Sequence, residues 1–295
     1  MIRAATLADA SEILAVANQH ELRIDPEFEV YPLSEFEQQI QGYSEPGHPF
    51  VFEQNGIQAA TLIQTDSARK RVEIDLFTVA SQEDTAAIFA FALGYVAEKF
   101  PDFQVRSACN KQDLELLDIF ENSGLKFYRD YYKLNKAPIS DGYPHLPRGL
   151  EIKSVSLTDK GELLHKLESE SFSGHFGYVQ ISVEDWLKER SADITADPTG
   201  SFVLSFEGEP AGFLLSNDAR ADVQGGWVDK LGVLEQFRGR GFGKLLLQWG
   251  TAHAAQKGYT SIALGADTGN DSGALELYFG LGFKEQLSWR AYSSQ

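Results

Sequence analysis

A glycine-rich segment with three cations is the part of the sequence best suited to hold a ligand. Residues Arg238–Lys244 read Arg-Gly-Arg-Gly-Phe-Gly-Lys, follow an apolar strand pattern and lead directly into an amphipathic helix pattern. Glycine lets the backbone turn tightly and lets a ligand approach its N–H groups. A helix N-terminus adds free donors and a partial positive charge. The segment therefore predicts a site for a pyrophosphate.

Two other phosphate-binding loops do not fit this segment. A dinucleotide-binding loop follows the first strand of a parallel unit, whereas three strands with hairpin character precede Arg238, and the spacing is Arg-x-x-Gly-x-Gly. A P-loop requires Ser or Thr after its Lys, but Leu245 follows Lys244. The remaining alternative is a glycine-rich turn that binds nothing.

A second motif lies downstream, and the two together carry a family resemblance. Arg238-x-x-Gly241-x-Gly243 resembles the acyl-CoA pyrophosphate loop of the GNAT N-acetyltransferase superfamily, and Ala274–Phe283 resembles its A-x-x-L-Y-x-x-x-G-F signature. The strand expected between them is Ser261–Gly265. The tandem layout described below, with the segment Phe172–His175, is similar to that of the mycothiol synthase family.

The resemblance implies a donor and a set of contacts. The donor substrate would be acetyl-CoA, with no metal. The backbone of Leu231, Gly232 and Val233 would bind the pantetheine arm and the thioester carbonyl. Tyr278 would protonate the departing thiolate, and Asn270 would give a further CoA contact, although the usual position is occupied by Asp271. The pyrophosphate would contact Arg238, Gly239, Arg240, Gly241, Phe242, Gly243 and Lys244.

The general base is less well marked. Period-two alternation places Trp227, Asp229, Leu231 and Val233 on one face of a strand, so Asp229 could deprotonate an amine directly or through water. A charge-paired structural role is equally compatible, and Asp75 stands at the matching place in the first half. His175 could contact the substrate, although a surface position is favoured for it.

These residues must be positioned by one of two diverged repeats. Ile2–Asp9 matches Ile152–Asp159, and in each half a hairpin, a third strand, a long helix, a further strand, a second helix and a final strand follow. The fold class is therefore α/β of the α+β type, with two tandem GNAT-like domains, each a mixed, mostly antiparallel sheet flanked by helices. In the first half the predicted hairpin is Pro49–Phe52 with Ala59–Ile63, the third strand is Arg71–Val79 and the long helix is Asp84–Lys99. In the second half the predicted hairpin is Ser201–Phe206 with Ala211–Leu215, the third strand is Gly226–Val233 and the long helix is Gly241–Lys257.

The predicted domains are 1–136, a degenerate copy, and 150–295, the catalytic copy. Residues 137–149 contain three prolines and two glycines and are predicted to be a linker. In the first copy Asp84, Ala87 and Phe89 replace Arg238, Gly241 and Gly243, and Phe120 replaces Tyr278. An acidic residue repels phosphate and Phe cannot donate a proton, so CoA is expected in the second copy alone.

Composition restricts the partners. The chain has 295 residues, with 26 Lys and Arg against 43 Asp and Glu, which argues against nucleic acid, including aminoacyl-tRNA. The acidity suits an amine substrate but also serves solubility. Cys109 is the single cysteine, so neither a disulfide framework nor a cysteine-rich metal site is expected. No signal peptide or membrane-spanning run is apparent, which predicts a cytoplasmic protein.

The sequence therefore predicts an acyl-CoA-dependent N-acyltransferase. The acetyl group would pass from acetyl-CoA to a primary amine of a small molecule by direct attack in a ternary complex. The alternatives are an enzyme that acts on a peptide N-terminus and a non-catalytic CoA-binding sensor or scaffold. The sequence does not indicate the acceptor or the oligomeric state.

Overall fold

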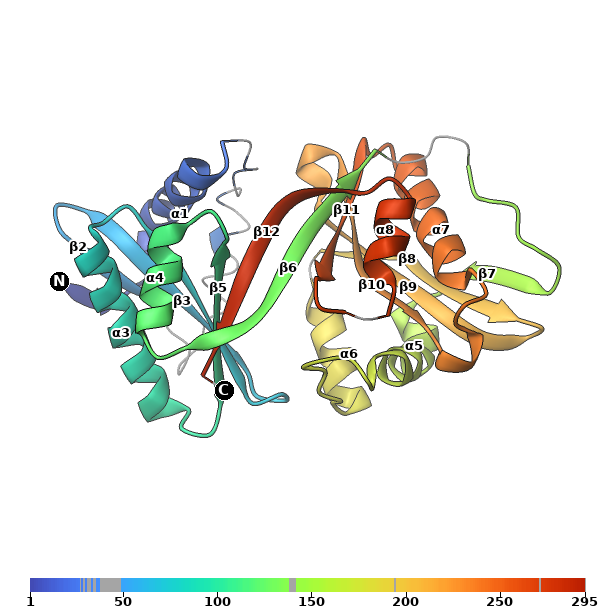
Figure 1. Cartoon of the computed structure of the whole chain (residues 1–295), viewed down its shortest axis with the longest axis horizontal. Helices are drawn as coiled ribbons and strands as arrows, with labels where there is room; N and C mark the ends of the chain where they lie inside the picture. Colours follow the sequence, from blue (N-terminus) through green and yellow to red (C-terminus); the bar gives the residue numbers. More distant parts are fainter. Residues whose placement is uncertain are drawn as a thin grey trace. The chain divides into compact units, whose positions relative to one another are not determined.

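The chain folds into two compact units. The computed structural model describes residues 1–26, 28, 30, 33, 36–37, 49–137, 142–193, 195–270 and 272–294. Unit 1 comprises Met1–Asp130 with Ser288–Gln295, and unit 2 comprises Tyr131–Leu287 (Figure 1). The predicted linker, 137–149, lies partly outside the described residues.

Unit 1 is built on a sheet with the strand order β1-β2-β3-β4-β5-β12. The pair formed by β4 and β5 is parallel, and the other recorded pairs are antiparallel. The predicted hairpin is confirmed as β2 and β3. The strands are β1 Ile2–Ala4, β2 Phe50–Glu53, β3 Ile57–Asp66, β4 Arg71–Thr78, β5 Gln104–Asn110 and β12 Lys284–Ser293.

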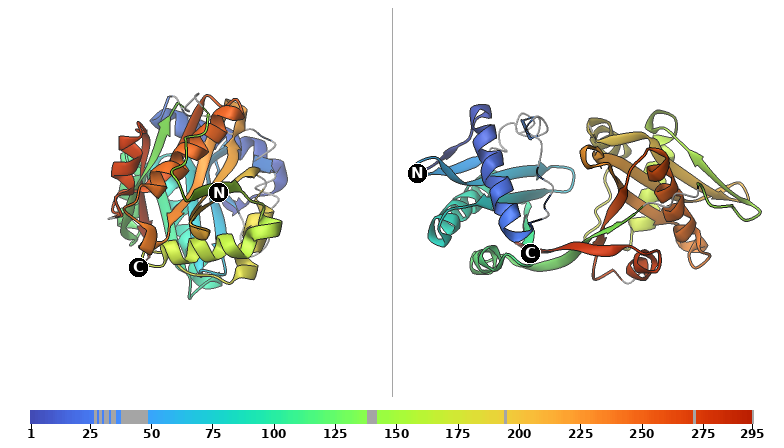
Figure 2. Two further views of the ribbon diagram at one scale, coloured as in Figure 1. Left: turned by 90° about the vertical axis from the view of Figure 1, so that its right-hand side faces the viewer. Right: turned by 90° about the horizontal axis from the view of Figure 1, so that it is seen from above.

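Helices cover both faces of this sheet because successive side chains of a strand point to opposite sides. On β3, Ala60 and Leu62 join the buried cluster that contains the apolar face of α1 (Ala10–Ile24), whereas Ala59 and Ile63 join the cluster that contains α3 (Gln82–Lys99) (Figure 2). Helix α4 (Leu114–Asn122) packs on the α3 side.

Unit 2 repeats this arrangement with the strand order β6-β11-β10-β9-β8-β7. Phe213 on β9 packs against Phe172 of α5, with ring centroids 6.4 Å apart. Its neighbour Leu214 lies against Gly250 of α7, where an added Cβ would come within 2.9 Å of it. Helices α5 and α7 therefore cover opposite faces. The elements are β6 Lys126–Lys136, β7 Leu150–Ser154, α5 Leu157–Phe172, α6 Val183–Ala192, β8 Ala196–Phe206, β9 Glu209–Arg220, β10 Gly225–Val233, α7 Phe242–Gln256, β11 Ser261–Asp267 and α8 Ala274–Gly280.

Two strands place the unit boundaries away from the predicted ones. Tyr131–Lys136 of β6 pair with β11 in unit 2, and Trp289–Ser293 of β12 pair with β5 in unit 1. The end of the predicted first domain, 1–136, thus supplies a strand to unit 2, and the end of the predicted second domain, 150–295, supplies a strand to unit 1. A sheet edge accepts any strand whose alternation fits its faces, so a repeat in the sequence does not reveal which copy of the strand completes which sheet.

Helix α6 has no counterpart among the predicted elements. It begins after Ser182, whose hydroxyl accepts the backbone N–H of Asp185 at 3.1 Å, and it buries Trp186.

Among the described residues, no helix combines the length and the apolar character that a bilayer crossing requires.

A buried ion network ties α7 to β8 in unit 2. The side chain of Asp197 is 2% exposed, and its carboxylate accepts hydrogen bonds from His253 at 2.8 Å and Lys257 at 2.9 Å. Thr199 donates its backbone N–H at 2.9 Å and its hydroxyl at 2.8 Å. Burial alone would raise the pKa of Asp197, but these donors hold it well below its usual range.

We expect Asp197→Asn to lower the free energy of unfolding by about 2 kcal/mol at neutral pH, because the charged hydrogen bonds of His253 and Lys257 to the buried carboxylate are weakened, while Lys257 keeps its ion pair with Asp218. A depressed folded-state pKa stabilises the protein above the ordinary Asp pKa of about 4, and this stabilisation is lost as the pH falls through the folded value. The difference from wild type should therefore shrink in acid. Urea unfolding at several pH values measures it, with the exposed Asp222→Asn as control. An equal loss at every pH would contradict the assignment.

Candidate active site

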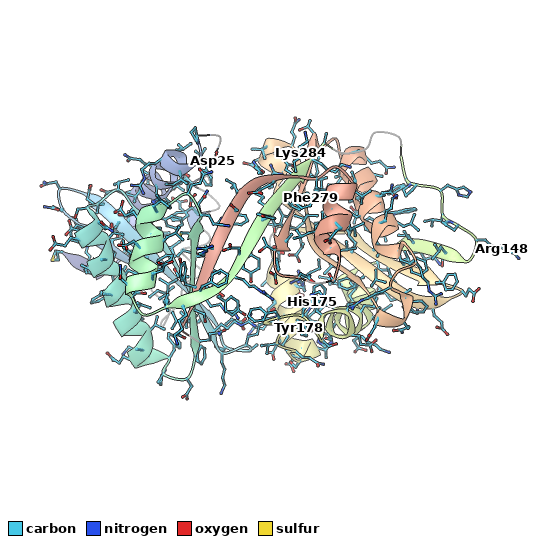
Figure 3. The ribbon with its side chains drawn as sticks, in the orientation of Figure 1. Asp25, Arg148, His175, Tyr178, Phe279 and Lys284 are labelled. Atoms are coloured by element: carbon cyan, nitrogen blue, oxygen red, sulfur yellow. The ribbon has the colours of Figure 1, made fainter. Side chains whose placement is uncertain are left out.

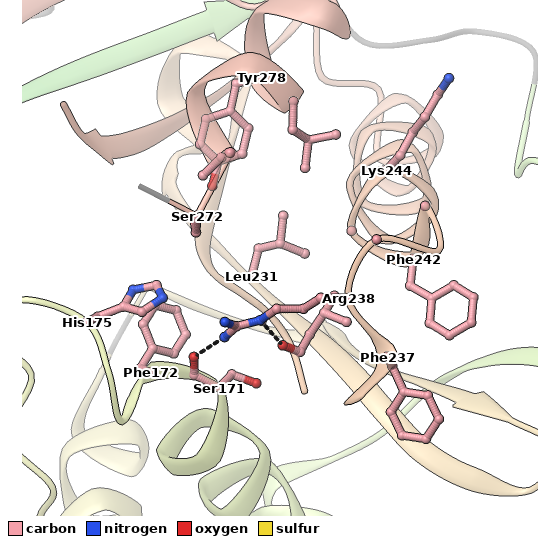
Figure 4. Close-up of a pocket in the computed structure, with 18 residues that line it drawn as sticks. Ser171, Phe172, His175, Leu231, Phe237, Arg238, Phe242, Lys244, Ser272 and Tyr278 are labelled. Atoms are coloured by element: carbon pink, nitrogen blue, oxygen red, sulfur yellow. Dashed lines mark hydrogen bonds between the residues drawn. The ribbon is translucent and has the colours of Figure 1, made fainter. Parts of the chain in front are cut away.

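The site lies where two parallel strands separate. Pairs between β10 and β11 run from Gly225 and Ser261 to Val228 and Leu264, whereas β10 continues to Val233. Beyond the paired stretch, Leu231, Gly232 and Val233 line a cavity of about 330 Å³ (Figure 4). Backbone groups on this part of β10 have lost a neighbouring strand on that side and are available to a ligand.

The N-terminus of α7 forms another wall. Gly241 precedes the helix with φ 80°, a left-handed conformation that favours glycine, and none of the described side chains caps the helix. Gly241, Phe242, Gly243 and Lys244 all line the cavity. A Cβ at Gly243 would lie 3.4 Å from Leu277, so glycine keeps this wall open. The uncapped N–H groups and the helix dipole favour an anion here.

The three cations of the loop have different positions. Arg238 donates from Nε to the Val233 carbonyl at 3.1 Å and from Nη2 to the Ser171 carbonyl at 2.8 Å, which joins β10 to α5 (Figure 4). Arg240 does not line the cavity, because its guanidinium lies over the rings of Phe206 and Phe237, 5.6 and 5.7 Å from their centroids. Its contact with the pyrophosphate stays a prediction. Lys244 is exposed at the cavity.

Tyr278 projects from α8 into the cavity (Figure 4). Its ring packs edge-on against Phe283, with centroids 6.2 Å apart. None of the described residues makes a hydrogen bond with its hydroxyl, and burial raises its pKa to about 12. The hydroxyl is therefore protonated and available to a ligand at neutral pH.

The end of α5 supplies residues that sequence reasoning underrated. His175 follows α5 in the segment that Figure 3 labels together with Tyr178, and it packs against the Phe172 ring at 4.6 Å. Phe172, His175 and Ser171 line the cavity, and His175 is half-buried there. Burial and the nearby Arg238 lower the pKa of His175. The buried Ser171 hydroxyl has no hydrogen-bond partner within the described parts of the chain.

Two predicted site residues lie elsewhere. Asp229 does not line the cavity but forms an ion pair with Arg190 of α6. The pairing of β10 with β9 shifts register between Val228 and Lys230, so the regular alternation used to orient Asp229 is interrupted there. Asn270 is also absent from the lining, and its side-chain oxygen accepts the Ser272 N–H at 2.9 Å. Asp271 lies outside the described residues.

The equivalent region of unit 1 has different side chains at the matching positions. Ser81 caps α3 by accepting the N–H of Asp84 at 3.2 Å and donating to its carboxylate at 2.7 Å. Phe89 and Phe120, which replace Gly243 and Tyr278, are fully buried against each other with ring centroids 4.8 Å apart. The N-terminus of α3 thus has a side-chain cap that α7 lacks, and the cavity between α3 and α4, of about 520 Å³, is lined by Phe89 together with Glu83 and Asp118.

Sequence comparisons identify relatives over about half of the chain. Residues 162–283 match the Acetyltransferase (GNAT) family model. Mycothiol acetyltransferase from Streptomyces griseus is 27% identical over 162 residues, covering 54% of this chain and 52% of that protein. Mycothiol acetyltransferase from Thermobispora bispora is 31% identical over 144 residues, covering 48% of each. The chain thus spans about half the length of the curated relatives it matches.

Solved structures match almost the whole chain. A GCN5-related N-acetyltransferase from Sphaerobacter thermophilus has a TM-score of 0.82 at 17% identity and covers 99% of this chain and 94% of its own. A tandem GNAT protein from the clavulanic acid biosynthesis pathway has a TM-score of 0.74 at 14% identity, with 99% and 97% covered. At these identities the likeness concerns the fold. The chain therefore has the tandem GNAT fold, and its residues 162–283 form a GNAT acetyltransferase domain.

Proposed function

We propose that unit 2 transfers an acetyl group from acetyl-CoA to a primary amine of a small molecule. The observation that carries the proposal is one cavity that joins the uncapped N-terminus of α7, the unpaired end of β10 and the free hydroxyl of Tyr278. The names of the mycothiol acetyltransferases support a small-molecule acceptor. The cytoplasmic location remains part of this proposal.

Acetyl-CoA would be held mainly by the backbone. The N–H groups of Gly241–Lys244 contact the pyrophosphate, and Lys244 adds a formal positive charge at the cavity. The backbone of Leu231–Val233 receives the pantetheine arm as an extended ligand. Arg238 acts through the protein, because its hydrogen bonds to Val233 and Ser171 fix the cavity wall.

Acetyl transfer requires that one proton be removed from the attacking amine and one be supplied to the departing thiolate. The neutral amine attacks the thioester carbonyl, a C–N bond forms and the C–S bond breaks, and the departing thiolate takes a proton from Tyr278. A phenol whose pKa is about 12 remains protonated throughout the neutral range and can supply that proton.

His175 is the better candidate base. It lines the cavity, and its lowered pKa keeps the imidazole neutral at pH 7, the form that accepts a proton. Asp229 would have to act from outside the cavity while paired with Arg190. We therefore assign Asp229 a positioning role on β10 and assign proton removal to His175.

The acidity that suits an amine substrate is not found in the described lining of this cavity. None of the 18 described residues that line it is Asp or Glu. The acidic balance is stronger in unit 1, with 11 Lys and Arg against 22 Asp and Glu, than in unit 2, with 15 against 21. The acceptor proposal therefore rests on the chemistry of acetyl transfer and on the relatives, not on net charge.

A CoA-binding sensor or scaffold is the competing function. Such a protein needs the loop and the β10 backbone but not an acid in contact with the thioester sulfur. The Tyr278 hydroxyl, which has no hydrogen-bond partner among the described residues, favours the enzyme. The peptide N-terminus alternative requires the same chemistry and differs in the acceptor.

Gly241→Glu should abolish acetyl-CoA binding, because it strains a left-handed residue and places a negative charge at the anion site. Ala87→Glu makes the same change at the matching, exposed position of unit 1 and should leave binding unchanged. Calorimetry on the full chain should give about one site per chain for wild type and for Ala87→Glu. Retained binding in Gly241→Glu would refute this location.

Tyr278→Phe should lower kcat by roughly 10²–10⁴-fold and leave the Kd for acetyl-CoA nearly unchanged, since the proton is needed only as charge develops on sulfur. Thiol release with an accepted amine measures kcat, and calorimetry measures the Kd. Full turnover in the variant would exclude Tyr278 as the acid, and intact binding with no turnover in wild type would favour the sensor.

His175→Gln should lower kcat/KM by roughly 10²–10⁴-fold and remove a pH inflection that lies below the ordinary His pKa of about 6.5. Because the neutral imidazole is the base, the wild-type rate should rise with pH through that inflection. Asp229→Asn should keep the inflection. The opposite pattern, with the inflection lost in Asp229→Asn alone, would return the base role to Asp229.

A further inference from the structure

Unit 1 contains a second cavity that acetyl transfer does not use. Strands β4 and β5 pair from Arg71 and Gln104 to Glu73 and Arg106, while β4 continues to Thr78 and β5 to Asn110. A cavity of about 300 Å³ lies beside the later residues of both strands, and the end of α1 also lines it. The strands of unit 1 thus border a space of their own, which shares no lining residue with the cavity beside Phe89 between α3 and α4.

The lining combines carboxylates with aromatic rings. Glu21 of α1 and Asp75 of β4 contribute carboxylates, and Phe77 and Trp289 contribute rings. None of the described lining residues is Lys or Arg. The Glu21 carboxylate makes no hydrogen bond or ion pair with the described residues, and the Asp75 carboxylate accepts a hydrogen bond from the Gln64 amide at 3.3 Å.

The surroundings do not neutralise these carboxylates. Burial raises the pKa of Glu21 to about 7 and that of Asp75 to about 6. Asp113, Asp25 and Asp75 act in the same direction on Glu21, as Glu73 does on Asp75. The groups next to them are already engaged: His20 and Arg23 contact Asp113 at 3.3 and 3.5 Å, and Arg23 also contacts Glu115 at 3.7 Å.

Partly buried carboxylates without a cation cost free energy when they ionise, and a cation bound between them offsets that cost. The rings favour an organic cation, because an ammonium group is attracted to an aromatic face.

We propose that this cavity binds a small organic cation, a protonated amine or a quaternary ammonium compound, through Glu21 and Asp75 with Phe77 and Trp289 beside it. Metal binding is disfavoured, because the described residues contain no group of three His, Cys, Asp or Glu side chains arranged for a metal ion. A CoA pyrophosphate is disfavoured by the two carboxylates. The site stands independently of acetyl transfer.

Choline is a suitable probe, because its charge is permanent, and 3,3-dimethyl-1-butanol has the same shape without the charge. Calorimetry on the full chain without CoA should show about one choline site per chain at pH 8, with the neutral alcohol at least about tenfold weaker. Because the ligand does not titrate, the affinity should rise with pH as Asp75 and Glu21 ionise, through pH 6 to 7.

Charge-removing variants locate the site. Glu21→Gln and Asp75→Asn should each weaken choline binding by about tenfold or more. Glu98→Gln, which removes an exposed carboxylate of α3, should change it less than about twofold. Trp289→Leu provides a second route, since it removes a ring and keeps both charges. Near-ultraviolet circular dichroism identifies any variant that fails to fold, and the choline affinities of the folded variants then test the proposal.

Each outcome supports or overturns the proposal. Binding that is lost in the cavity variants and kept in Glu98→Gln supports it. It is overturned if wild type binds no choline at about 10 mM, if the neutral alcohol binds equally well, or if the variants bind as wild type does. Calcium chloride that competes with choline would show an inorganic cation site in its place. Since acetyl-CoA is absent throughout, failure here leaves the proposed acetyl transfer untouched.

Discussion

Each unit contains one pair of parallel strands that separates, and this separation is the constraint on which the cavity beside β10 and the cavity beside Glu21 and Asp75 depend. Inside a sheet, a neighbouring strand satisfies each backbone N–H and C=O group. Where β10 runs on past its last pair with β11, that partner is missing, and the exposed backbone together with the N-terminus of α7 forms an anion-binding wall. The pair β4 and β5 separates in the same way in unit 1, so each unit has a place for a ligand before any side chain is considered.

Side-chain size then decides which of these places is open. Gly243 and the projecting Tyr278 line the cavity of unit 2, whereas a fully buried ring pair, Phe89 and Phe120, occupies the matching positions of unit 1. Glycine also sets helix capping, since Gly241 leaves the N-terminus of α7 uncapped while Ser81 caps α3. Two units with the same strand order thus differ in the side chains around the matching region, and therefore in the ligands that this region suits.

Charge in this protein acts locally and not through the net value. Arg238 binds two carbonyl groups, Arg240 lies on two rings, and Lys257 belongs to the network of Asp197. Asp229 and Arg190 neutralise each other on the α6 side of β10. The cavity of unit 2 consequently has no carboxylate among its described residues, while unit 1 keeps Glu21 and Asp75 without a cationic partner there.

The sequence by itself determined the features that depend on neighbouring residues. Alternation, helical periodicity and glycine spacing predicted the repeat, the hairpins and the loop at Arg238–Lys244, because backbone preference and local side-chain direction follow from adjacent residues. The resemblance of Ala274–Phe283 to a family signature indicated Tyr278. Tertiary structure alone decided the exchange of β6 and β12, the ion pair of Asp229, the stacking of Arg240 and the placing of Ser171 and His175 beside β10. Each depends on a partner distant in sequence or on a register shift, and a single irregularity such as the one at Asp229 interrupts the regular alternation of the strand.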